Sequence, residues 1–314
     1  MKQVEKIVAF AGGVGGAKLV DGLAQWLEPS ELTVIVNTGD DFEHFGLSIS
    51  PDLDTVCYTL ANLANPDSGW GRKNETWRTI EEIRTLQGPD WFNIGDLDLA
   101  THLERTRLLQ EGQKLSEITA HFCESWRVRI PVFPMSDTPI RTFVHCKDGR
   151  RLPFQEYFVK YHFEPEIQSI EFANIEKAVV PEKALRAIQA ADFIIFCPSN
   201  PFVSIDPIIN IKEIGESIAK KKVIAISPLI GGEALKGPAA KMARELGMTS
   251  CSSEVAGHYK NILSCFILDK KDEDQIALVE GWGIICKALD IAMPDRSERK
   301  RLAGQILKIL EGNF

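Results

Sequence analysis

Hydrophobic residues follow two alternating patterns near the N-terminus. Residues 6–11 and 32–36 are short apolar runs rich in β-branched side chains, and glycine or polar turns bound them, as is typical of buried strands. Between them, apolar residues recur at the spacing of a helix, and Pro29 closes that segment. A strand, a helix and a strand in this order predict a βαβ unit and therefore a parallel sheet.

The same pattern returns in the C-terminal half of the chain. Apolar runs at 192–197, 222–227 and 265–269 predict further buried strands, and helical patterns cover 207–220 and 233–246. We expect these strands to share one sheet with the N-terminal pair. The predicted fold class is α/β, a Rossmann-like and mostly parallel sheet flanked by helices.

The middle of the chain has a different pattern, in which amphipathic helices come first and alternating strands follow around an Asp148-Gly149 turn. The predicted helices are 76–86, 98–110 and 115–126. We interpret this stretch as an inserted, mainly helical subdomain. The resulting division is a core of residues 1–62 and 180–314 and an insertion of residues 63–179.

Composition narrows the class of protein. The 314 residues carry 36 Lys and Arg against 44 Asp and Glu, a net charge of −8, which argues against a nucleic-acid partner. No apolar run approaches the ~18 residues of a membrane span, and the N-terminus lacks a signal-peptide hydrophobic region. The seven scattered cysteines show no metal-binding spacing. We therefore expect a cytoplasmic protein with reduced, mostly buried thiols and no membrane partner.

A glycine loop is the first candidate site. Gly12, Gly13, Gly15, Gly16 and Lys18 directly follow the first strand and open the first helix. Backbone amides at a helix N-terminus bind anions, and glycine lets a phosphate approach closely. The alternative is a tight turn that binds nothing. We favour phosphate binding because open α/β sheets bind ligands at the carboxyl ends of their strands.

The loop departs from the two common nucleotide-binding templates. A P-loop requires glycine at Ala17 and serine or threonine at Leu19, and a dinucleotide fingerprint requires glycine at Lys18. The second strand also ends in Asn37 where a dinucleotide site has an acidic ribose ligand. These departures disfavour an ordinary ATPase and a nicotinamide-dependent oxidoreductase.

Four aspartates form the second candidate site. Asp40 and Asp41 follow the second strand, and Asp52 and Asp54 come soon after, so all four fall near the carboxyl ends of adjacent strands. Mg²⁺ takes one or two carboxylates and completes its shell with water and substrate phosphates. The alternative is helix capping, because Ser50 and the proline after it suit the start of a helix whose dipole favours acidic residues.

Several further residues are weaker candidates. Ser199 and Asn200 end one predicted strand and Ser227 ends the next, so their polar groups should face the same crevice, although such turns also form for local reasons. His102 is the histidine most suited to face a site, and packing is its alternative. An aromatic wall for a flat ring, or simply core, would come from Trp70, Trp77, Trp91 and Phe92.

Taken together, these segments resemble the phospholactate transferase (CofD) family of coenzyme F-420 biosynthesis. The matching blocks run in order through nearly the whole chain. They are AGGVGGAKLVDGLA, VNTGDDFEHFGLSISPDLDTVCYTL, GWGRKNETW, WFNIGDLDLATH, FPMSDTPIRT, CPSNPFVSIDPI and SPLIGGEALKGPAAKM. The resemblance implies a Rossmann-like core with an inserted helical subdomain and, as partner, a second copy in a homodimer.

The resemblance also implies a reaction. Members of the family transfer a phospholactyl or phosphoenolpyruvyl group from a guanosine-diphosphate-activated donor to the terminal ribityl hydroxyl of the deazariboflavin FO, and they release GMP with help from magnesium. The glycine loop and the Ser199-Asn200 turn would hold the donor. Asp40, Asp41 or Asp54 would hold Mg²⁺, with Asp54 nearest the hydroxyl and Asp40 as the second acidic anchor.

Two positions depart from the family pattern. Family sequences often carry a basic residue at Asn93, which can still hydrogen-bond a ligand, and a second acidic residue at Thr138. We place Asn93 and Asp96 among the expected binding residues, and Asp137 alone is a modest candidate for the metal.

Two other classes of function compete with the transferase. One is a noncatalytic UDP-sugar-binding regulatory protein of the gluconeogenesis-factor type, which shares the glycine loop and the sheet. The other is the oxidoreductase that the glycine spacing disfavours. The GWG and GDLDLATH blocks favour the transferase. No residue distinguishes lactate, enolpyruvate or glycerate as the acid that is transferred.

Overall fold

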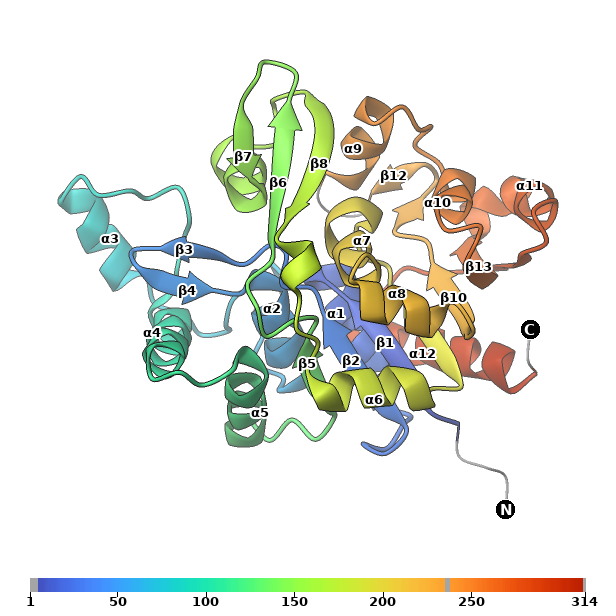
Figure 1. The fold of residues 1–314 in the computed structure, drawn as a ribbon, viewed down its shortest axis with the longest axis horizontal. Helices are drawn as coiled ribbons and strands as arrows, with labels where there is room; N and C mark the ends of the chain where they lie inside the picture. Colours follow the sequence, from blue (N-terminus) through green and yellow to red (C-terminus); the bar gives the residue numbers. More distant parts are fainter. Residues whose placement is uncertain (1–4, 235–237, 313–314) are drawn as a thin grey trace.

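A parallel sheet of seven strands lies at the centre of the computed structural model, which describes residues 5–234 and 238–312 (Figure 1). The strand order is β14-β13-β10-β9-β1-β2-β5, and every neighbouring pair is parallel. The strands are β1 (Ile7–Ala11), β2 (Leu32–Val36), β5 (Val132–Pro134), β9 (Phe193–Phe196), β10 (Lys222–Ile226), β13 (Leu263–Asp269) and β14 (Ile285–Leu289). The predicted fold class is confirmed.

The sequence in which the chain adds strands to the sheet switches sides at β1. Ile7 lies opposite Leu32 of β2 on one side and opposite Phe193 of β9 on the other. The chain therefore builds outward to β5 first and then outward from β9 to β14. Such a switch point leaves a crevice at the carboxyl ends of the two central strands. It also confirms that the N-terminal and C-terminal strand regions share one sheet.

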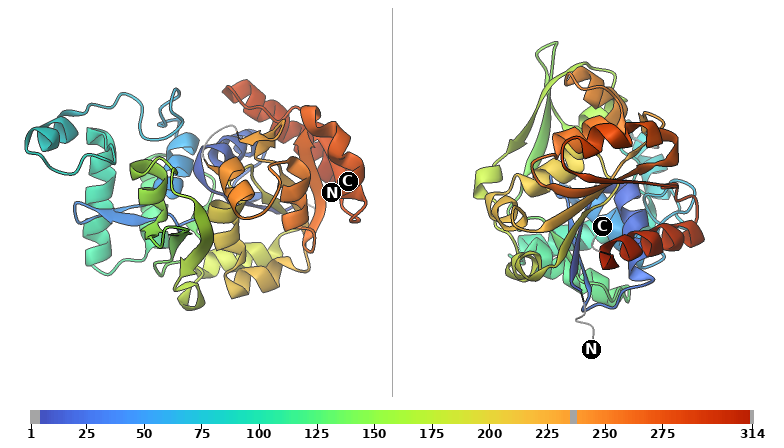
Figure 2. Two further views of the ribbon diagram at one scale, coloured as in Figure 1. Left: turned by 90° about the horizontal axis from the view of Figure 1, so that it is seen from above. Right: turned by 90° about the vertical axis from the view of Figure 1, so that its right-hand side faces the viewer.

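Helices cover both faces of the sheet (Figures 1 and 2). Each face has its own hydrophobic core, which side chains from the strands and the covering helices form together. One face is covered by α1 (Gly13–Ala24), α2 (Pro51–Leu60), α5 (Leu115–Ser125) and α12 (Arg296–Glu311). The other is covered by α6 (Glu182–Ala190), α7 (Asp206–Ile209), α8 (Lys212–Ile218), α10 (Ser252–His258) and α11 (Ile276–Glu280).

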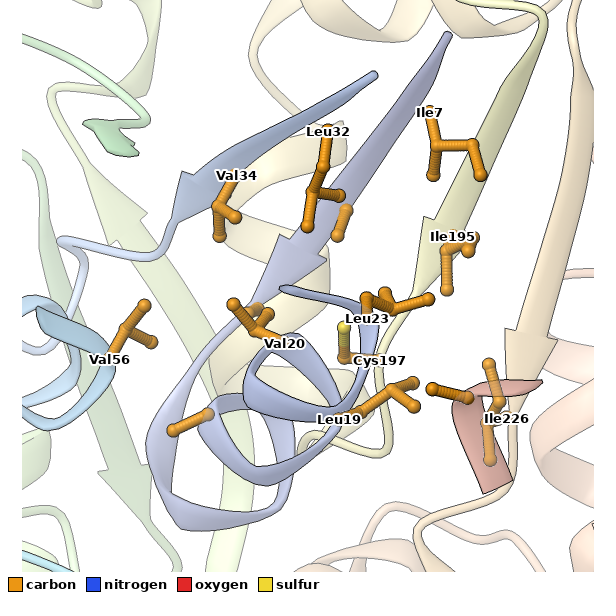
Figure 3. Close-up of a cluster of buried hydrophobic side chains, with 14 of the residues drawn as sticks. Ile7, Leu19, Val20, Leu23, Leu32, Val34, Val56, Ile195, Cys197 and Ile226 are labelled. Carbon is orange, nitrogen blue, oxygen red and sulfur yellow. The ribbon is translucent and has the colours of Figure 1, made fainter. Parts of the chain in front are cut away.

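The predicted first helix packs on the sheet through one apolar face. In Figure 3, Leu19, Val20 and Leu23 of α1 lie against side chains of the central strands, including Val34 and Ile195, and all five are fully buried. The three- and four-residue spacing of these leucine and valine positions keeps them on one side of the helix. This packing fixes the start of α1 at the crevice.

Two predicted helices differ from the observed elements. The pattern over 207–220 forms α7 and then α8, two separate helices. The pattern over 233–246 begins instead with strand β12 (Glu233–Ala234), which pairs with β11 (Leu229–Ile230), and only its later part is helix α9 (Ala239–Glu245). Residues 235–237 of that prediction lie outside the described residues.

The middle of the chain contains the three predicted helices and one antiparallel sheet. The helices are α3 (Arg78–Thr85), α4 (Asp96–Gln110) and α5, and the 148–149 turn joins β6 to β7. The sheet consists of β7 (Arg151–Pro153), β6 (Arg141–Cys146) and β8 (Ile167–Ala173). A separate antiparallel hairpin, β3 (Phe42–His44) with β4 (Leu47–Ile49), precedes this region. Short helical turns complete this region and the C-terminal half: η1 (Glu156–Lys160), η2 (Ile175–Lys177), η3 (Pro201–Ile205) and η4 (Lys270–Gln275).

The division into core and insertion stays a prediction, and one strand crosses it. Strand β5 falls within residues 63–179, yet it pairs with β2 at the edge of the central sheet.

All seven cysteines are free, and all but Cys251 are buried. Among the described residues, none of the helices has the length and apolar character that crossing a bilayer requires.

Replacement of Leu19 tests the core beneath the crevice. Leu19→Ala removes a fully buried side chain and should lower the free energy of unfolding by roughly 2–5 kcal/mol. Leu86→Ala is the matched control, because Leu86 is 72% exposed and its loss should change stability by at most about 0.5 kcal/mol. Urea unfolding of both variants checks this, and equal losses would contradict the packing.

Candidate active site

The glycine loop packs tightly against the end of β9. A Cβ atom added to Gly15 would lie 2.2 Å from the carbonyl oxygen of Pro198, and one added to Gly16 would lie 2.5 Å from Ser199 Oγ. The Ser199 hydroxyl accepts a hydrogen bond from the Gly12 amide at 3.1 Å and donates one to the Gly12 carbonyl at 2.7 Å. These glycines therefore let two strand ends meet at the switch point. The predicted site residues Gly12 and Ser199 are in direct contact.

A carboxylate of the protein lies at the start of α1. A Cβ atom on Gly12 would come within 2.5 Å of Asp52 Oδ2, which also accepts a 2.9 Å hydrogen bond from Asn37 Nδ2. The Gly13 backbone hydrogen-bonds the same carboxyl group. Asp52 therefore occupies the helix N-terminus that the sequence suggested for a phosphate.

Asp52 was one of the four candidate aspartates, but the sequence did not single it out. Its position two residues after Ser50 was consistent both with a magnesium site and with helix capping. Burial raises the pKa of Asp52 to about 6, although the hydrogen bonds from Asn37 and Gly13 oppose that rise. Nothing local to α2 signals that its first turn reaches α1.

Asn37 and Lys18 have different places. Asn37 is fully buried, and besides Asp52 it binds the Val203 carbonyl at 3.1 Å and accepts a hydrogen bond from the Gly39 amide at 2.9 Å. It therefore connects the end of β2 to α2 and to η3. Lys18 lies in the second turn of α1 and is partly exposed.

The loop after β2 contains buried oxygens that have no hydrogen-bond partner among the described residues. Asp40 and Asp41 are buried, and the Oδ1 atom of each lacks a partner, whereas Asp41 Oδ2 accepts a 2.7 Å hydrogen bond from Ser50 Oγ. The hydroxyl oxygens of Thr38 and Thr142 are unpartnered too. Buried polar atoms are usually satisfied, so these exceptions are candidates to bind a ligand.

Burial sets the charge state of these two acids. It raises the pKa of Asp40 well above its usual range, and the nearby Asp52 carboxyl adds to that rise. Burial also raises the pKa of Asp41 to about 7, against the opposing effects of Arg141 and the hydrogen bond from Ser50. A cation bound here would favour the ionised forms.

Asp54 differs because it has a cation beside it. Its Oδ1 atom forms an ion pair with Arg105 of α4, and His102 Nδ1 lies 3.7 Å from Oδ2. Burial still raises the pKa of Asp54, although Arg105 and His102 oppose that rise. Oδ2 is buried and makes no hydrogen bond among the described residues. One oxygen of Asp54 is therefore available to a ligand.

His102 is buried at 1% exposure and lies between two carboxyl groups. Its Nε2 atom is 3.5 Å from Asp98 Oδ2, and Tyr58 of α2 donates a 2.7 Å hydrogen bond to Asp98 Oδ1. The side chains of Asp54, Asp98 and His102 lie close enough to share a metal ion. Among the described residues this is the one group of three such side chains, and Asp40 and Asp41 do not belong to it.

An aromatic cluster lies beside the acids. Phe42 contacts Trp91 and Phe92 with ring centroids 5.8 and 4.9 Å apart, and His44 lies 5.1 Å from Trp91 and 4.1 Å from Phe45. Burial and the charge of the nearby His102 lower the pKa of His44, which connects this cluster to the Asp54 network. Trp91 and Phe92 thus gather as predicted.

Trp70 and Trp77 do not take part in the ring contacts of that cluster. They are 48% and 37% exposed. The hairpin residues Phe42, His44 and Phe45 take their place, and the sequence pattern did not identify these as aromatic-wall residues. They lie on a short hairpin whose three-residue strands carry little periodic signal.

Two predicted binding residues make local contacts on the helical side. Asn93 is exposed and accepts a 2.6 Å hydrogen bond from Arg84. Asp96 caps the start of α3, where it accepts hydrogen bonds from Thr76 and Thr79 that lower its pKa to about 2. Asp137 accepts hydrogen bonds from the amide and hydroxyl of Ser116.

Asn200 and Ser227 also make contacts within the protein. Asn200 Oδ1 accepts a hydrogen bond from the Phe202 amide at the start of η3. Ser227 is fully buried and its hydroxyl lies 2.9 Å from that of Ser252, which in turn donates to Asp272. This second polar cluster follows β10, and none of its hydrogen bonds reaches the four aspartates.

Comparison with known proteins identifies the class of this fold and site. The profile of the family described as 2-phospho-L-lactate transferase CofD matches residues 7–297. A phosphoenolpyruvate transferase of Streptomyces griseus is 39% identical over 98% of both chains. A 2-phospho-L-lactate transferase of Methanococcoides burtonii is 36% identical over 96% of this chain and 99% of its own.

The protein, with its Rossmann-like α/β core and buried acidic site, is therefore an enzyme of the transferase class. The chain is a member of the CofD family of 2-phospho-L-lactate transferases. A crystal structure of a UPF0052 family member from Bacillus halodurans shares the fold, with a TM-score of 0.62 and 14% identity over 98% of this chain and 100% of that one.

Replacement of Gly15 tests the packing of the loop. Gly15→Ala places a methyl group against the backbone at Pro198, which cannot yield as a flexible side chain would, and should lower stability by about 2 kcal/mol or more. Gly312→Ala is the control, since its Cβ would meet the nearest atoms at an ordinary 3.6 Å. Thermal unfolding compares the two. Similar unfolding midpoints for the two variants would show that the loop can accommodate a methyl group at Gly15.

The pKa of Asp41 predicts a pH dependence of stability. Its pKa rises from 3.8 to about 7 on folding, so the native state binds more protons than the unfolded chain between these values. The contribution of Asp41 to the free energy of unfolding of the metal-free protein should therefore fall as the pH rises from about 4 to about 7.

Asp41→Asn removes this contribution, so its stability should fall less over the same range. Urea unfolding in chelator at several pH values measures the difference. Asp295→Asn is the control, because Asp295 is an exposed helix cap whose pKa is lowered rather than raised. Parallel curves for wild type and Asp41→Asn would contradict the assignment.

Proposed function

We propose that the protein transfers a phospholactyl or phosphoenolpyruvyl group from a guanosine-diphosphate-activated donor to the terminal ribityl hydroxyl of FO, with release of GMP, in coenzyme F-420 biosynthesis. The observation that carries this proposal is family membership over residues 7–297 together with the buried, unpartnered carboxyl oxygens at the sheet crevice. Relatives named for both acids match along nearly their full length, so both remain candidate groups.

The ligand type of the acidic residues supports a magnesium ion. Asp40, Asp41 and Asp54 each offer a buried oxygen that has no hydrogen-bond partner among the described residues, and Mg²⁺ prefers such hard oxygen ligands. Asp54 also lies close enough to Asp98 and His102 for the three to share one ion, whereas Asp40 and Asp41 do not belong to that group. Bound Mg²⁺ supplies positive charge where the phosphate oxygens gain negative charge. The raised pKa values of Asp40 and Asp41 support the same assignment, because a cation would compensate their burial.

The neighbouring groups support a place for the acceptor. The aromatic cluster suits a flat deazaflavin ring. We assign the ribityl hydroxyl to Asp54 Oδ2, a buried oxygen of the adjoining network that has no hydrogen-bond partner among the described residues. The hydroxyl oxygen bonds to the phosphorus that bears the acid, the bond from that phosphorus to the GMP oxygen breaks, and a carboxylate of the site takes the hydroxyl proton. The protein contributes mainly alignment to this step.

The donor would lie along the carboxyl ends of β1 and β9. The side chains of Ser199 and Asn200 already hold the loop together. We therefore assign donor contacts at these positions and in the glycine loop to the backbone. The expected homodimer and cytoplasmic location remain part of the same proposal.

A direct assay tests the function. Purified protein, Mg²⁺ and FO are incubated with the guanylylated phospholactate or phosphoenolpyruvate donor, and GMP is measured together with a more acidic fluorescent product. We expect product with at least one donor. Tight binding of a UDP-sugar without turnover of any donor would replace the transferase with the regulatory protein that the sequence left as its alternative.

Asp54→Asn tests the acidic anchor nearest the hydroxyl. The variant should fold, because asparagine keeps the size of the side chain, but kcat should fall by about 100-fold or more. Asp295→Asn, which removes the charge of an exposed cap of α12, is the control and should keep wild-type turnover. Near-normal turnover of Asp54→Asn would remove Asp54 from the mechanism.

A further inference from the structure

Helix α4 carries a charged side chain that is almost completely buried. Arg105 is 1% exposed, and a buried guanidinium is costly unless its donors are satisfied. Its Nη2 atom pairs with Asp54, and its Nη1 atom lies 3.3 Å from both the Ser48 carbonyl and His102 Nδ1. The Phe122 ring lies 5.9 Å from its Cζ atom. Arg105 therefore joins β4, α2 and α5 to its own helix.

The contacts of Arg105 make the two oxygens of Asp54 unequal. Oδ1 is held by the guanidinium, whereas Oδ2 is buried and has no hydrogen-bond partner among the described residues. The Ser48 carbonyl fixes the other arm of the guanidinium, and this planar fork limits how the carboxylate can rotate. A lysine has no second arm, so it would carry the charge without this constraint.

We propose that Arg105 is a positioning residue, which binds Oδ1 of Asp54 so that Oδ2 stays directed to the reacting site. The proposal rests on the function proposed above, because it gives Asp54 its place beside the acceptor hydroxyl and Mg²⁺. In this proposal Arg105 acts through Asp54 and contacts neither the substrates nor the metal. When one residue orients a metal ligand or a reacting group in this way, that group needs the orienting residue for its full contribution to binding or catalysis.

The structure offers a close comparison within the same pair of helices. Tyr58 and Asp98 form a second buried polar contact between α2 and α4, and the Tyr58 hydroxyl makes no hydrogen bond to Asp54. If Arg105 only joined the two helices, loss of the Tyr58 hydroxyl should resemble loss of the guanidinium fork. If Arg105 orients Asp54, only the change at Arg105 should reduce turnover.

The experiment compares Arg105→Lys with Tyr58→Phe and with Arg107→Lys, an arginine of the same helix that pairs with Glu104 and Glu111 at the surface. Arg105→Lys keeps the positive charge beside Asp54, so it should fold, and thermal unfolding confirms this. We expect kcat to fall by about 100-fold while KM for FO changes little, and both comparison variants to keep wild-type kcat. A wild-type kcat in Arg105→Lys, or an equal loss in Tyr58→Phe, would overturn the proposal.

Binding of Mn²⁺, followed by electron paramagnetic resonance, separates this inference from the function itself. Absence of product with wild type and every donor would reject the proposed function, and the metal measurement would then decide on Arg105. A dissociation constant raised about 10-fold or more in Arg105→Lys but not in Tyr58→Phe supports positioning. Equal constants in the three proteins, or no Mn²⁺ binding by wild type, would overturn it.

Discussion

The burial of acidic side chains at the carboxyl edge of the sheet is the constraint on which this structure depends. Asp40, Asp41, Asp52 and Asp54 are each less than a tenth exposed. Taking such groups out of water is expensive, and each is compensated differently. Asp54 has Arg105 at Oδ1, Asp52 has Asn37 and the start of α1, and Asp40, Asp41 and Asp54 each retain one oxygen that has no hydrogen-bond partner among the described residues. These unpartnered oxygens, more than the residue types, separate the candidate ligands from a structural carboxylate such as Asp52.

Much of the fold follows from local patterns in the sequence. Buried parallel strands such as β1 and β9 are short apolar runs, and α1 has apolar residues at helical spacing. Each of these elements can therefore be predicted without knowledge of its neighbours. The limits are equally local. Strand β5 has three residues, and its place beside β2 depends on a pairing across about a hundred positions of chain. The strands β3 and β4 also have three residues each, which is too short for a clear periodic pattern in the sequence.

The candidate site divides in the same way. Residue type and position predicted that Asp40, Asp41 and Asp54 would be brought to one edge, and the structure buries all three. The sequence could not show that Arg105, fifty-one residues after Asp54, is its partner, since this contact depends on how α4 packs on α2. Nor could it show that Asp96 and Asn93 are occupied by neighbours on α3. Roles that depend on tertiary partners were the ones that sequence reasoning missed.

The place of Asp52 changes what the glycine motif means in this protein. An internal anion already neutralises the positive end of α1, so these glycines serve first to admit a side chain of the enzyme. A negatively charged ligand therefore meets a helix terminus whose positive end Asp52 already compensates in part. Contacts from the loop backbone to such a ligand then need support from other groups around the crevice.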